Sequence, residues 1–151
     1  MPLLLVLDTN VVLDWLYFRD PRCDALARTI RTGRACWLAS GAMHDELAHV
    51  LGRGVRTIGE RAGDAAAVLA GWRRWATPLE RDGRAVPPGL RCSDADDQKF
   101  IDLAWQVGAS ALLSRDRAVL KLARRAALHG LRICDVDRWP GAADAGSTQV
   151  R

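Results

Sequence analysis

The stretch Leu3-Leu4-Leu5-Val6-Leu7-Asp8-Thr9-Asn10 decides the fold of this chain. Five apolar residues follow one another without the polar alternation of a half-exposed strand, and the run ends at an acid. Such a run is typical of a strand that is buried on both faces at the centre of a parallel sheet. Asp8 then lies at the carboxyl end of that strand, which is where open α/β sheets bind their ligands.

Asp8 has two interpretations at this stage. Aspartate is a poor strand former, and a buried carboxylate without a partner is costly. Asp8 therefore needs a cation, a positively charged side chain or a helix N-terminus. Either it only caps the helix that follows, with help from Asn10, or it belongs to a functional site, and this stretch alone favours neither.

The composition is that of an ordinary globular protein. The chain has 151 residues, of which 49% are hydrophobic and 26% charged, enough for one domain with a real core. We expect that domain over residues 1–140 and a disordered tail over 141–151. No apolar run approaches the ~20 residues that span a bilayer, and the start lacks a positively charged leader. We therefore expect a cytoplasmic protein without a membrane partner.

The cysteines and the net charge indicate which kinds of site and partner to expect. The four cysteines are scattered without a CxxC pair, which indicates reduced thiols rather than a zinc site or a disulfide framework. The net charge of +4 and the pI of about 9.2 favour an anionic partner such as a nucleic acid or an acidic protein.

Segments typical of strands and helices alternate along the chain. After the strand at 3–7, we expect strands near 35–39, 85–86, 110–113 and 131–134. Helices are expected at about 11–16, 21–30, 40–51, 60–75, 95–107 and 118–128. This alternation predicts a three-layer α/β/α domain with a central, mostly parallel sheet of four to five strands. Right-handed crossovers then place the carboxyl ends of the strands on one rim.

Acidic residues that follow strands or lie near helix starts are brought to this rim. They are Asp8, Glu46, Asp94, Asp96, Asp97 and Asp116. Converging carboxylates repel one another, so the arrangement persists only with a counter-cation or with raised pKa values. Oxygen ligands alone indicate a hard ion, Mg²⁺ or Mn²⁺, and such ions activate water and stabilise in-line displacement at phosphorus. A basic protein with a negative pocket is thus suited to cutting a phosphodiester.

Several of these acids also have a simpler interpretation. Asp94 and Asp96 suit a helix start through the helix dipole, whatever their function. Asp45 is better explained as a solvated neighbour of Glu46 than as a ligand. The three histidines have no metal-like spacing with one another or with cysteine.

The chain as a whole resembles the PIN-domain ribonucleases, in the group that contains the toxins of toxin–antitoxin pairs (VapC-like). The segments that carry the resemblance are Leu7-Asp8-Thr9-Asn10, Ser40 through Leu47, Arg91 through Phe100, Gly108-Ala109, and Leu112-Leu113-Ser114-Arg115-Asp116. The resemblance covers about residues 3–139 in the right order, and the Asp-rich run before Lys99 is its most selective part. One departure is Ala95, where this group commonly has proline, which loosens the turn but removes no ligand.

The resemblance implies a metal-dependent endoribonuclease that uses Mg²⁺ or Mn²⁺. The positions that match the family's four catalytic and metal-binding acids are Asp8, Glu46, Asp97 and Asp116. The positions that match its supporting residues are Asn10, Ser114, Asp94 and Asp96. Asp97 is preferred to Asp96 as the ligand because of its spacing to Gly108. The implied partners are an RNA substrate, an antitoxin protein that covers the site, and a second copy of the chain in a homodimer.

Two other functions remain open from the sequence. A catalytically inactive module with the PIN fold would bind RNA or protein, although the presence of all four acids argues against it. A phosphatase similar to the haloacid dehalogenases would use Asp8 as its nucleophile. Those enzymes typically carry a second acid two residues later, where this chain has Asn10.

Overall fold

The computed structural model describes residues 1–54, 64–80 and 82–141. Five strands in these ranges form one sheet with the order β3-β2-β1-β4-β5, and every strand pair is parallel. The strands are β1 (Leu3–Leu7), β2 (Ala35–Ala39), β3 (Ala76–Pro78), β4 (Ala111–Leu113) and β5 (Ile133–Cys134). The predicted parallel sheet is confirmed.

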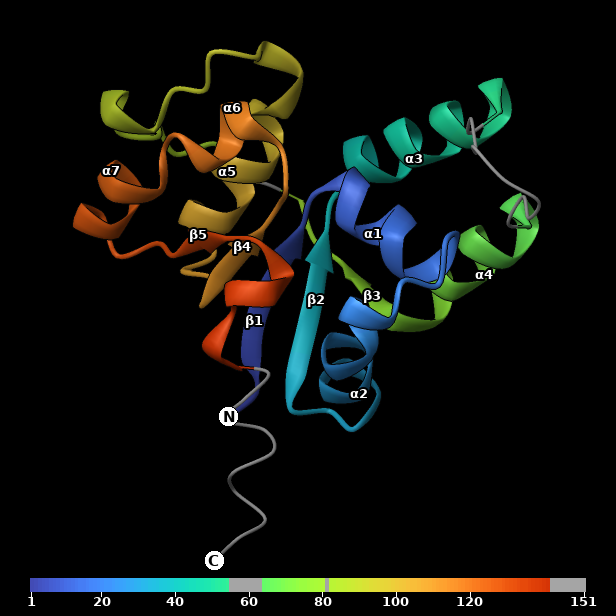
Figure 1. Ribbon diagram of the computed structural model, residues 1–151. Coiled ribbons are helices and arrows are strands. Elements are labelled where there is room, and N and C mark those ends of the chain that lie inside the picture. The colour runs from blue at the N-terminus through green and yellow to red at the C-terminus, as the bar shows by residue number, and fades with distance from the viewer. Residues whose placement is uncertain (55–63, 81, 142–151) are drawn as a thin grey trace, which may run out of the picture.

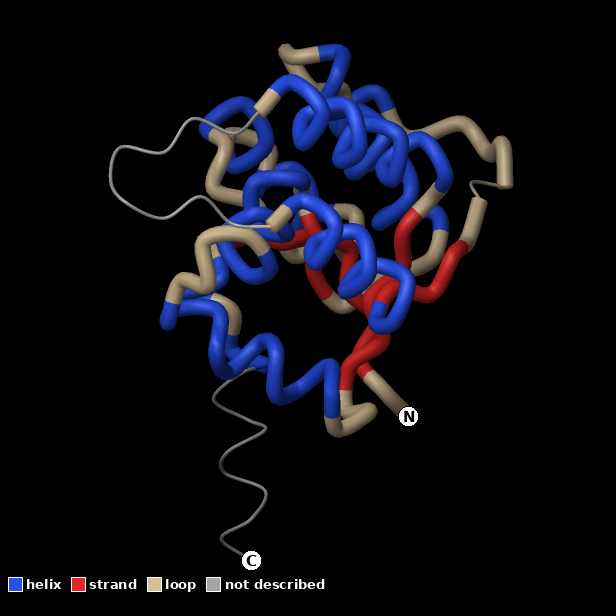
Figure 2. The backbone as a smooth tube through the Cα atoms, turned by 90° about the vertical axis from the view of Figure 1, so that its right-hand side faces the viewer, coloured by secondary structure: helices blue, strands red, loops and turns tan. Residues whose placement is uncertain are grey.

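Helices cover both faces of this sheet. They are α1 (Thr9–Leu16), α2 (Asp24–Arg31), α3 (Gly41–Arg53), α4 (Ala65–Trp75), α5 (Gln98–Gln106), α6 (Arg117–Leu120) and α7 (Ala123–Leu128). Short 3₁₀ turns complete the set: η1 (Pro21–Cys23), η2 (Pro88–Leu90), η3 (Ala95–Asp97) and η4 (Val136–Arg138). Figure 1 shows α1–α4 grouped on one side of the sheet and α5–α7 on the other. Figure 2, viewed from the side of α1–α4, shows these helices in front of the strands, so the predicted α/β/α layering is confirmed.

The strand order creates a switch point next to β1. The chain proceeds from β1 outward through β2 to β3 and then returns to the other side of β1 for β4 and β5. An open parallel sheet binds ligands in the crevice where the strand order reverses in this way. Leu7 pairs with Leu113, and the Asp8 N–H donates to the Leu113 carbonyl at 2.9 Å. Asp8 and the residues after Leu113 therefore lie at this crevice.

The rim rests on a tightly packed core. Leu5 and Val6 of β1 are fully buried, as a central parallel strand requires. On β2, Trp37 packs against Trp15 of α1 and Trp72 of α4, with ring centroids 5.5 and 6.4 Å away. Each large side chain buried in this way contributes about 1.5–3 kcal/mol, so α1 and α4 are held firmly against the sheet.

The strand expected at 85–86 is wrong, because the edge strand is β3. It follows α4 directly and pairs with β2 over Ala76–Pro78. Pro78 has no N–H to donate, which an edge strand tolerates because one side of its backbone is unpaired. Residues 82–87 form no regular element.

The helix boundaries also differ from the expected ones. The helix predicted at 118–128 is two short helices, α6 and α7, and the one predicted at 95–107 begins with the turn η3. Helix α4 begins at Ala65, after an Asp64 side chain that accepts from the Ala66 N–H at 2.9 Å. Residues 60–63, where its start was expected, and 142–151, in the expected tail, lie outside the described residues. None of the helices in the described ranges is long and apolar enough to cross a membrane.

Candidate metal centre

Asp8 directly follows β1, and the hydroxyl of Ser114, the residue after β4, holds its side chain in place. It occupies the N-cap position of α1, but its side chain makes no capping hydrogen bond. Instead its Oδ2 accepts from Ser114 Oγ at 2.7 Å, in a bond that is buried. Capping therefore does not explain why this strand ends in a carboxylate.

Asp116 is positioned by the same serine. The Ser114 hydroxyl, which is fully buried, accepts from the Asp116 N–H at 3.0 Å while donating to Asp8. Asp116 begins α6, and its Oδ1 accepts from the Ala118 N–H at 2.9 Å. One side chain, Ser114, thus fixes the relative placement of two acids that are more than a hundred residues apart in sequence.

Asp97 reaches the same place from the opposite side. It ends η3 and precedes α5, and it is only 8% exposed. Its Oδ2 is buried and has no hydrogen-bond partner among the described residues. Since a buried carboxylate oxygen without a donor is costly, this atom points to a group that the described residues do not supply.

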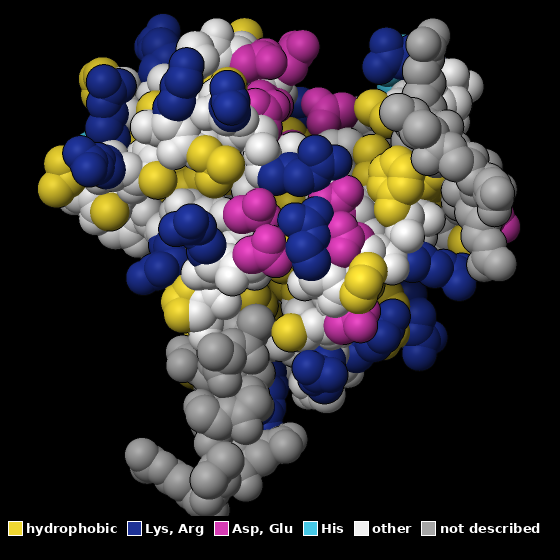
Figure 3. Space-filling model, viewed as in Figure 1, with side chains coloured by type: hydrophobic (Ala, Val, Ile, Leu, Met, Phe, Trp, Pro, Cys, Tyr) yellow, Lys and Arg dark blue, Asp and Glu magenta, His cyan; other side chains and the backbone are white. Residues whose placement is uncertain are grey.

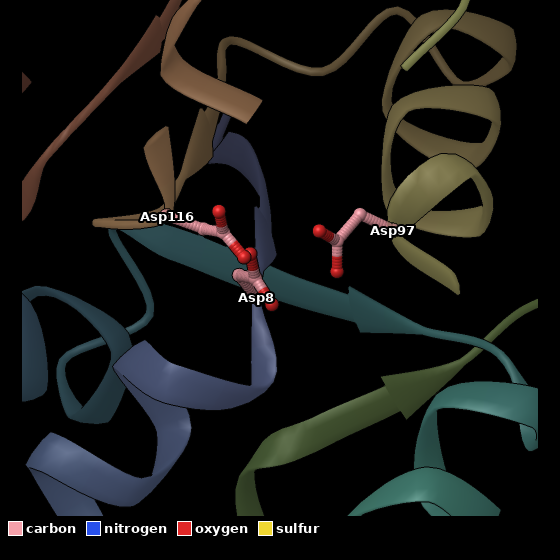
Figure 4. Close-up of side chains that lie close together, drawn as sticks. All are labelled: Asp8, Asp97 and Asp116. Atoms are coloured by element: carbon pink, nitrogen blue, oxygen red, sulfur yellow. The ribbon is translucent and has the colours of Figure 1, made fainter. Parts of the chain in front are cut away.

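The carboxylates of Asp8, Asp97 and Asp116 form one cluster, called the carboxylate group below. One oxygen from each lies within 4.8 Å of the others. Figure 4 shows Asp8 and Asp116 adjacent at the strand ends, with Asp97 directed toward them from α5. Acidic side chains gather at the top of the space-filling view, between the α5–α7 side and α3, with Lys and Arg side chains around them (Figure 3).

The environment favours the protonated forms of Asp8 and Asp97. Burial raises the pKa of Asp8, an effect opposed by the Ser114 hydroxyl and reinforced by the charges of Glu46 and Asp116. Burial also raises the pKa of Asp97, to about 7, with further contributions from the charges of Asp8 and Asp116. Mutual repulsion in a desolvated site is the condition in which carboxylates take up either a proton or a metal cation.

Glu46 lies on the same rim but in a different environment. Its Oε1 accepts from Lys99 Nζ at 2.5 Å, and its Oε2 accepts from the Thr9 hydroxyl. The cluster of possible metal ligands found among the described residues does not include Glu46. It is close enough for its charge to raise the pKa of Asp8, so it contributes to the field of the carboxylate group from beside it.

The other predicted site residues have local structural contacts. Asn10 Oδ1 accepts from the Arg115 N–H at 3.4 Å. Asp94 caps η3, because its Oδ1 accepts from the Asp96 N–H at 3.0 Å. Asp96 is exposed, and its carbonyl accepts from Lys99 Nζ at 2.5 Å. The carboxylates of Asp94 and Asp96 do not join the carboxylate group.

Two cations that adjoin the cluster in sequence are bound elsewhere. Lys99 pairs with Glu46, and the Arg115 Nε donates to Asp14 Oδ2 at 2.7 Å. Among the described residues, no ion pair joins Asp8, Asp97 or Asp116 to a basic side chain. The counter-charge of the carboxylate group must therefore come from outside these residues or from protons.

Reasoning from the sequence did not identify the roles of Lys99, Thr9 and the Asp14–Arg115 pair. Lys99 had one available signal, since it lies in the first turn of a helix whose start was already assigned to the rim. Thr9 and Asp14 had none, because their partners are 37 and 101 residues away.

The carboxylate group fits a divalent cation on the chemistry of its own atoms. Its donors are all carboxylate oxygens, which hard ions such as Mg²⁺ and Mn²⁺ prefer, and one of them is buried without a partner. The fold and this cluster together define an α/β protein with an acidic centre at the switch point of a parallel sheet.

A comparison with protein families identifies the family. The sequence pattern of the PIN domain matches residues 4–118, which include all three members of the carboxylate group. The chain belongs to the PIN domain family, a nuclease-type fold whose nucleases use divalent metal ions. A comparison with curated proteins found no match.

Proposed function

We propose that this chain is a metal-dependent endoribonuclease that hydrolyses RNA phosphodiester bonds. The observation that carries the proposal is the carboxylate group: three acids within 4.8 Å, one with a buried unpartnered oxygen, and no cation among the described residues to neutralise them. Asp8, Asp97 and Asp116 are the residues that would hold Mg²⁺ or Mn²⁺. An ion held there supplies an activated water and stabilises the charge that develops during in-line displacement at phosphorus.

The residues around the group have separate tasks in this proposal. Ser114 fixes Asp8 relative to Asp116, so that the ligands are in place before the ion binds. Glu46 and Lys99 form a neutral pair beside the ligands, which adds polar groups to the rim without adding net charge. Basic side chains around the rim attract the phosphate backbone (Figure 3).

The resemblance to toxins extends the proposal to the chain's partners. We propose that the protein is the toxin of a toxin–antitoxin pair, that an antitoxin covers the carboxylate group, and that the chain forms a homodimer. A small reading frame next to its gene whose product binds the protein and suppresses cleavage would support the first two points. Light scattering on the purified protein tests the third.

The activity is tested with purified protein, RNA and Mg²⁺ or Mn²⁺. We expect cleavage by the unaltered protein and its loss in Asp8→Asn, with the circular-dichroism spectrum unchanged. Asp45→Asn is the matched control, because Asp45 lies next to Glu46 and its side chain is 87% exposed. Cleavage that survives Asp8→Asn would contradict the assignment. RNA binding without divalent-ion binding would favour an inactive module with the same fold.

A further inference from the structure

A second cleft lies beside the candidate metal centre, along α5. Its volume is about 760 Å³, within the range of about 300–1,000 Å³ that is usual for small-molecule sites. One wall contains Gln98, Asp102 and Gln106, whose four-residue spacing places them on one face of α5. The other wall belongs to residues 82–92, called the strap here, which lie on the α5–α7 side of the molecule (Figure 1).

Two glutamines of α5 fasten the strap at both ends of the cleft. Gln98 Nε2 donates to the Leu90 carbonyl at 2.9 Å, and Gln98 Oε1 accepts from the Cys92 N–H at 2.6 Å. Gln106 Nε2 donates to the Arg84 carbonyl at 2.6 Å. The strap residues between these attachments line the cleft. Its two walls are therefore tied together by direct hydrogen bonds, and the cleft is preformed.

One end of the cleft lies near the carboxylate group, although none of the three acids lines the cleft. Ala95, which lines the cleft, lies two residues before Asp97. Cys92 also lines it, and its Sγ donates to the Ala118 carbonyl at 3.5 Å. The Ala118 N–H in turn binds the Asp116 carboxylate at 2.9 Å. A molecule in the cleft would therefore border the proposed ion site.

The chemistry of the walls suits a nucleotide. Val86, Pro87 and Pro88 offer apolar surface to the face of a base. Gln106 is 8% exposed, and its Oε1 has no donor among the described residues, so it is an acceptor that an amino group on a base can satisfy. Arg91 is exposed and lines the cleft, and its side chain forms no hydrogen bond or ion pair with a described residue. A free guanidinium of this kind matches a phosphate.

We propose that the cleft binds one nucleotide of single-stranded RNA next to the bond that is cleaved, an inference that rests on the proposed nuclease function. The base lies against the strap, its amino group faces Gln106, and its phosphate pairs with Arg91. The RNA must be single-stranded, because a base enters a cleft only after it leaves a stack. Uracil lacks an amino group, so uridine is expected to be the weakest occupant.

RNA binding in EDTA tests this assignment without relying on cleavage. The probes are fluorescein-labelled oligo(A) and oligo(U) of about six nucleotides, followed by anisotropy. Val86→Trp fills the cleft and should weaken oligo(A) binding about tenfold or more, the size of a lost base contact. Arg91→Ala should weaken it about threefold or more and lower the slope of log K against log salt by about 0.7, the value for one phosphate contact on a single strand.

Matched controls lie at exposed positions that do not line the cleft. Leu128→Trp adds the same indole at a position that is 86% exposed and outside the cleft. Arg31→Ala removes the same charge from an exposed position at the end of α2, just before the amino end of β2. Both controls should bind oligo(A) as the unaltered protein does.

The outcomes separate this inference from the proposed function. If the unaltered protein binds oligo(A), Val86→Trp does not, and neither cleaves RNA, the cleft assignment stands and the nuclease function fails. If the protein cleaves RNA while Val86→Trp and Arg91→Ala bind oligo(A) normally, the cleft assignment is wrong and the nuclease function stands. Arg91→Ala changes only an exposed side chain, so it decides the matter where Val86→Trp does not fold. A Val86→Trp variant that keeps RNA affinity but loses a protein partner also overturns the nucleotide assignment.

Discussion

The carboxylate group and Glu46 share one rim of the sheet and differ in what neutralises their charge. Asp8, Asp97 and Asp116 face one another without a basic partner among the described residues. Glu46, on the neighbouring helix α3, is bound by the Lys99 ammonium and the Thr9 hydroxyl. The comparison teaches that an acid on this rim can already be neutralised by side chains of the protein itself. What distinguishes the carboxylate group is that its counter-charge is not supplied from inside the described protein.

The largest effect is expected from removing the charge of a residue in the carboxylate group. Asp97→Asn keeps the shape of the side chain but loses a charge that a divalent ion requires, so cleavage should fall by about a hundredfold or more. Calorimetric titration with Mn²⁺ should show a matching loss of affinity. Asp96→Asn is the matched comparison, because it removes the same charge one residue away from an exposed side chain. Equal losses of cleavage and Mn²⁺ affinity in the two variants would contradict the assignment of Asp97, rather than Asp96, as the ligand.

The serine that joins two of the ligands should matter next most. Ser114→Ala leaves Asp8 Oδ2 and the Asp116 N–H without their buried partner, which costs about 1–3 kcal/mol. Thermal unfolding should therefore occur about 3–10 °C lower. Thr9→Val removes the hydroxyl that donates to Glu46, but Glu46 keeps its bond to Lys99. The unfolding temperature of Thr9→Val should therefore fall less than that of Ser114→Ala. A larger fall in unfolding temperature in Thr9→Val than in Ser114→Ala would mean that the contacts of Glu46 stabilise the rim more than those of Asp8 and Asp116.

The contrast between the carboxylate group and Glu46 also shows which features of the site could be predicted from the sequence. Asp8 and Asp116 could be placed together from sequence, because a buried apolar run before each acid predicts parallel strands whose carboxyl ends share a rim. Asp97 could be assigned to the rim as well, but the choice between it and Asp96 depends on which side chain is buried. That choice is a property of packing between η3 and the strand ends, which sequence spacing only approximates.

The pairing of Glu46 could not have been predicted in the same way. Its partners lie 53 and 37 residues away, on two other helices, and nothing local to Glu46 distinguishes a ligand from an acid already neutralised. The position of β3 had a similar difficulty. A three-residue strand that directly follows a helix carries too few residues to show a period of two, so the apolar pair at 85–86 was the stronger local signal.

The pH dependence of stability should show that the charge of Asp97 is not neutralised by a basic side chain. The pKa of Asp97 is raised from 3.8 to about 7, so between these values the folded state holds a proton that the unfolded state has lost. In the absence of metal, the contribution of Asp97 to stability is therefore fully present at low pH and is lost as the pH rises from about 4 to about 7. The raised pKa of Asp8 acts in the same direction.

Unfolding by denaturant in EDTA at pH 5 and pH 8 measures this loss. The fall in unfolding free energy should be smaller in Asp97→Asn by about 1–2 kcal/mol, since the amide has no proton to lose. Mn²⁺ at pH 8 should restore the stability of the unaltered protein, because the ion takes the place of the proton. A pH profile that is the same in both proteins would mean that Asp97 is ionised without cost.

The smallest effect, a change in Mn²⁺ affinity, is expected from changing Lys99, the partner of Glu46. Lys99→Met removes the cation that neutralises Glu46 and leaves an additional negative charge close enough to Asp8 to act on it. A charge interaction of this kind is worth about 0.5–1 kcal/mol in a water-like dielectric, so Mn²⁺ should bind about two- to fivefold more tightly. Lys99→Met combined with Glu46→Gln removes the added charge and should return the affinity to its original value. Weaker Mn²⁺ binding in Lys99→Met would instead indicate that Lys99 holds the ligands in place, and that Glu46 and the carboxylate group function as one unit.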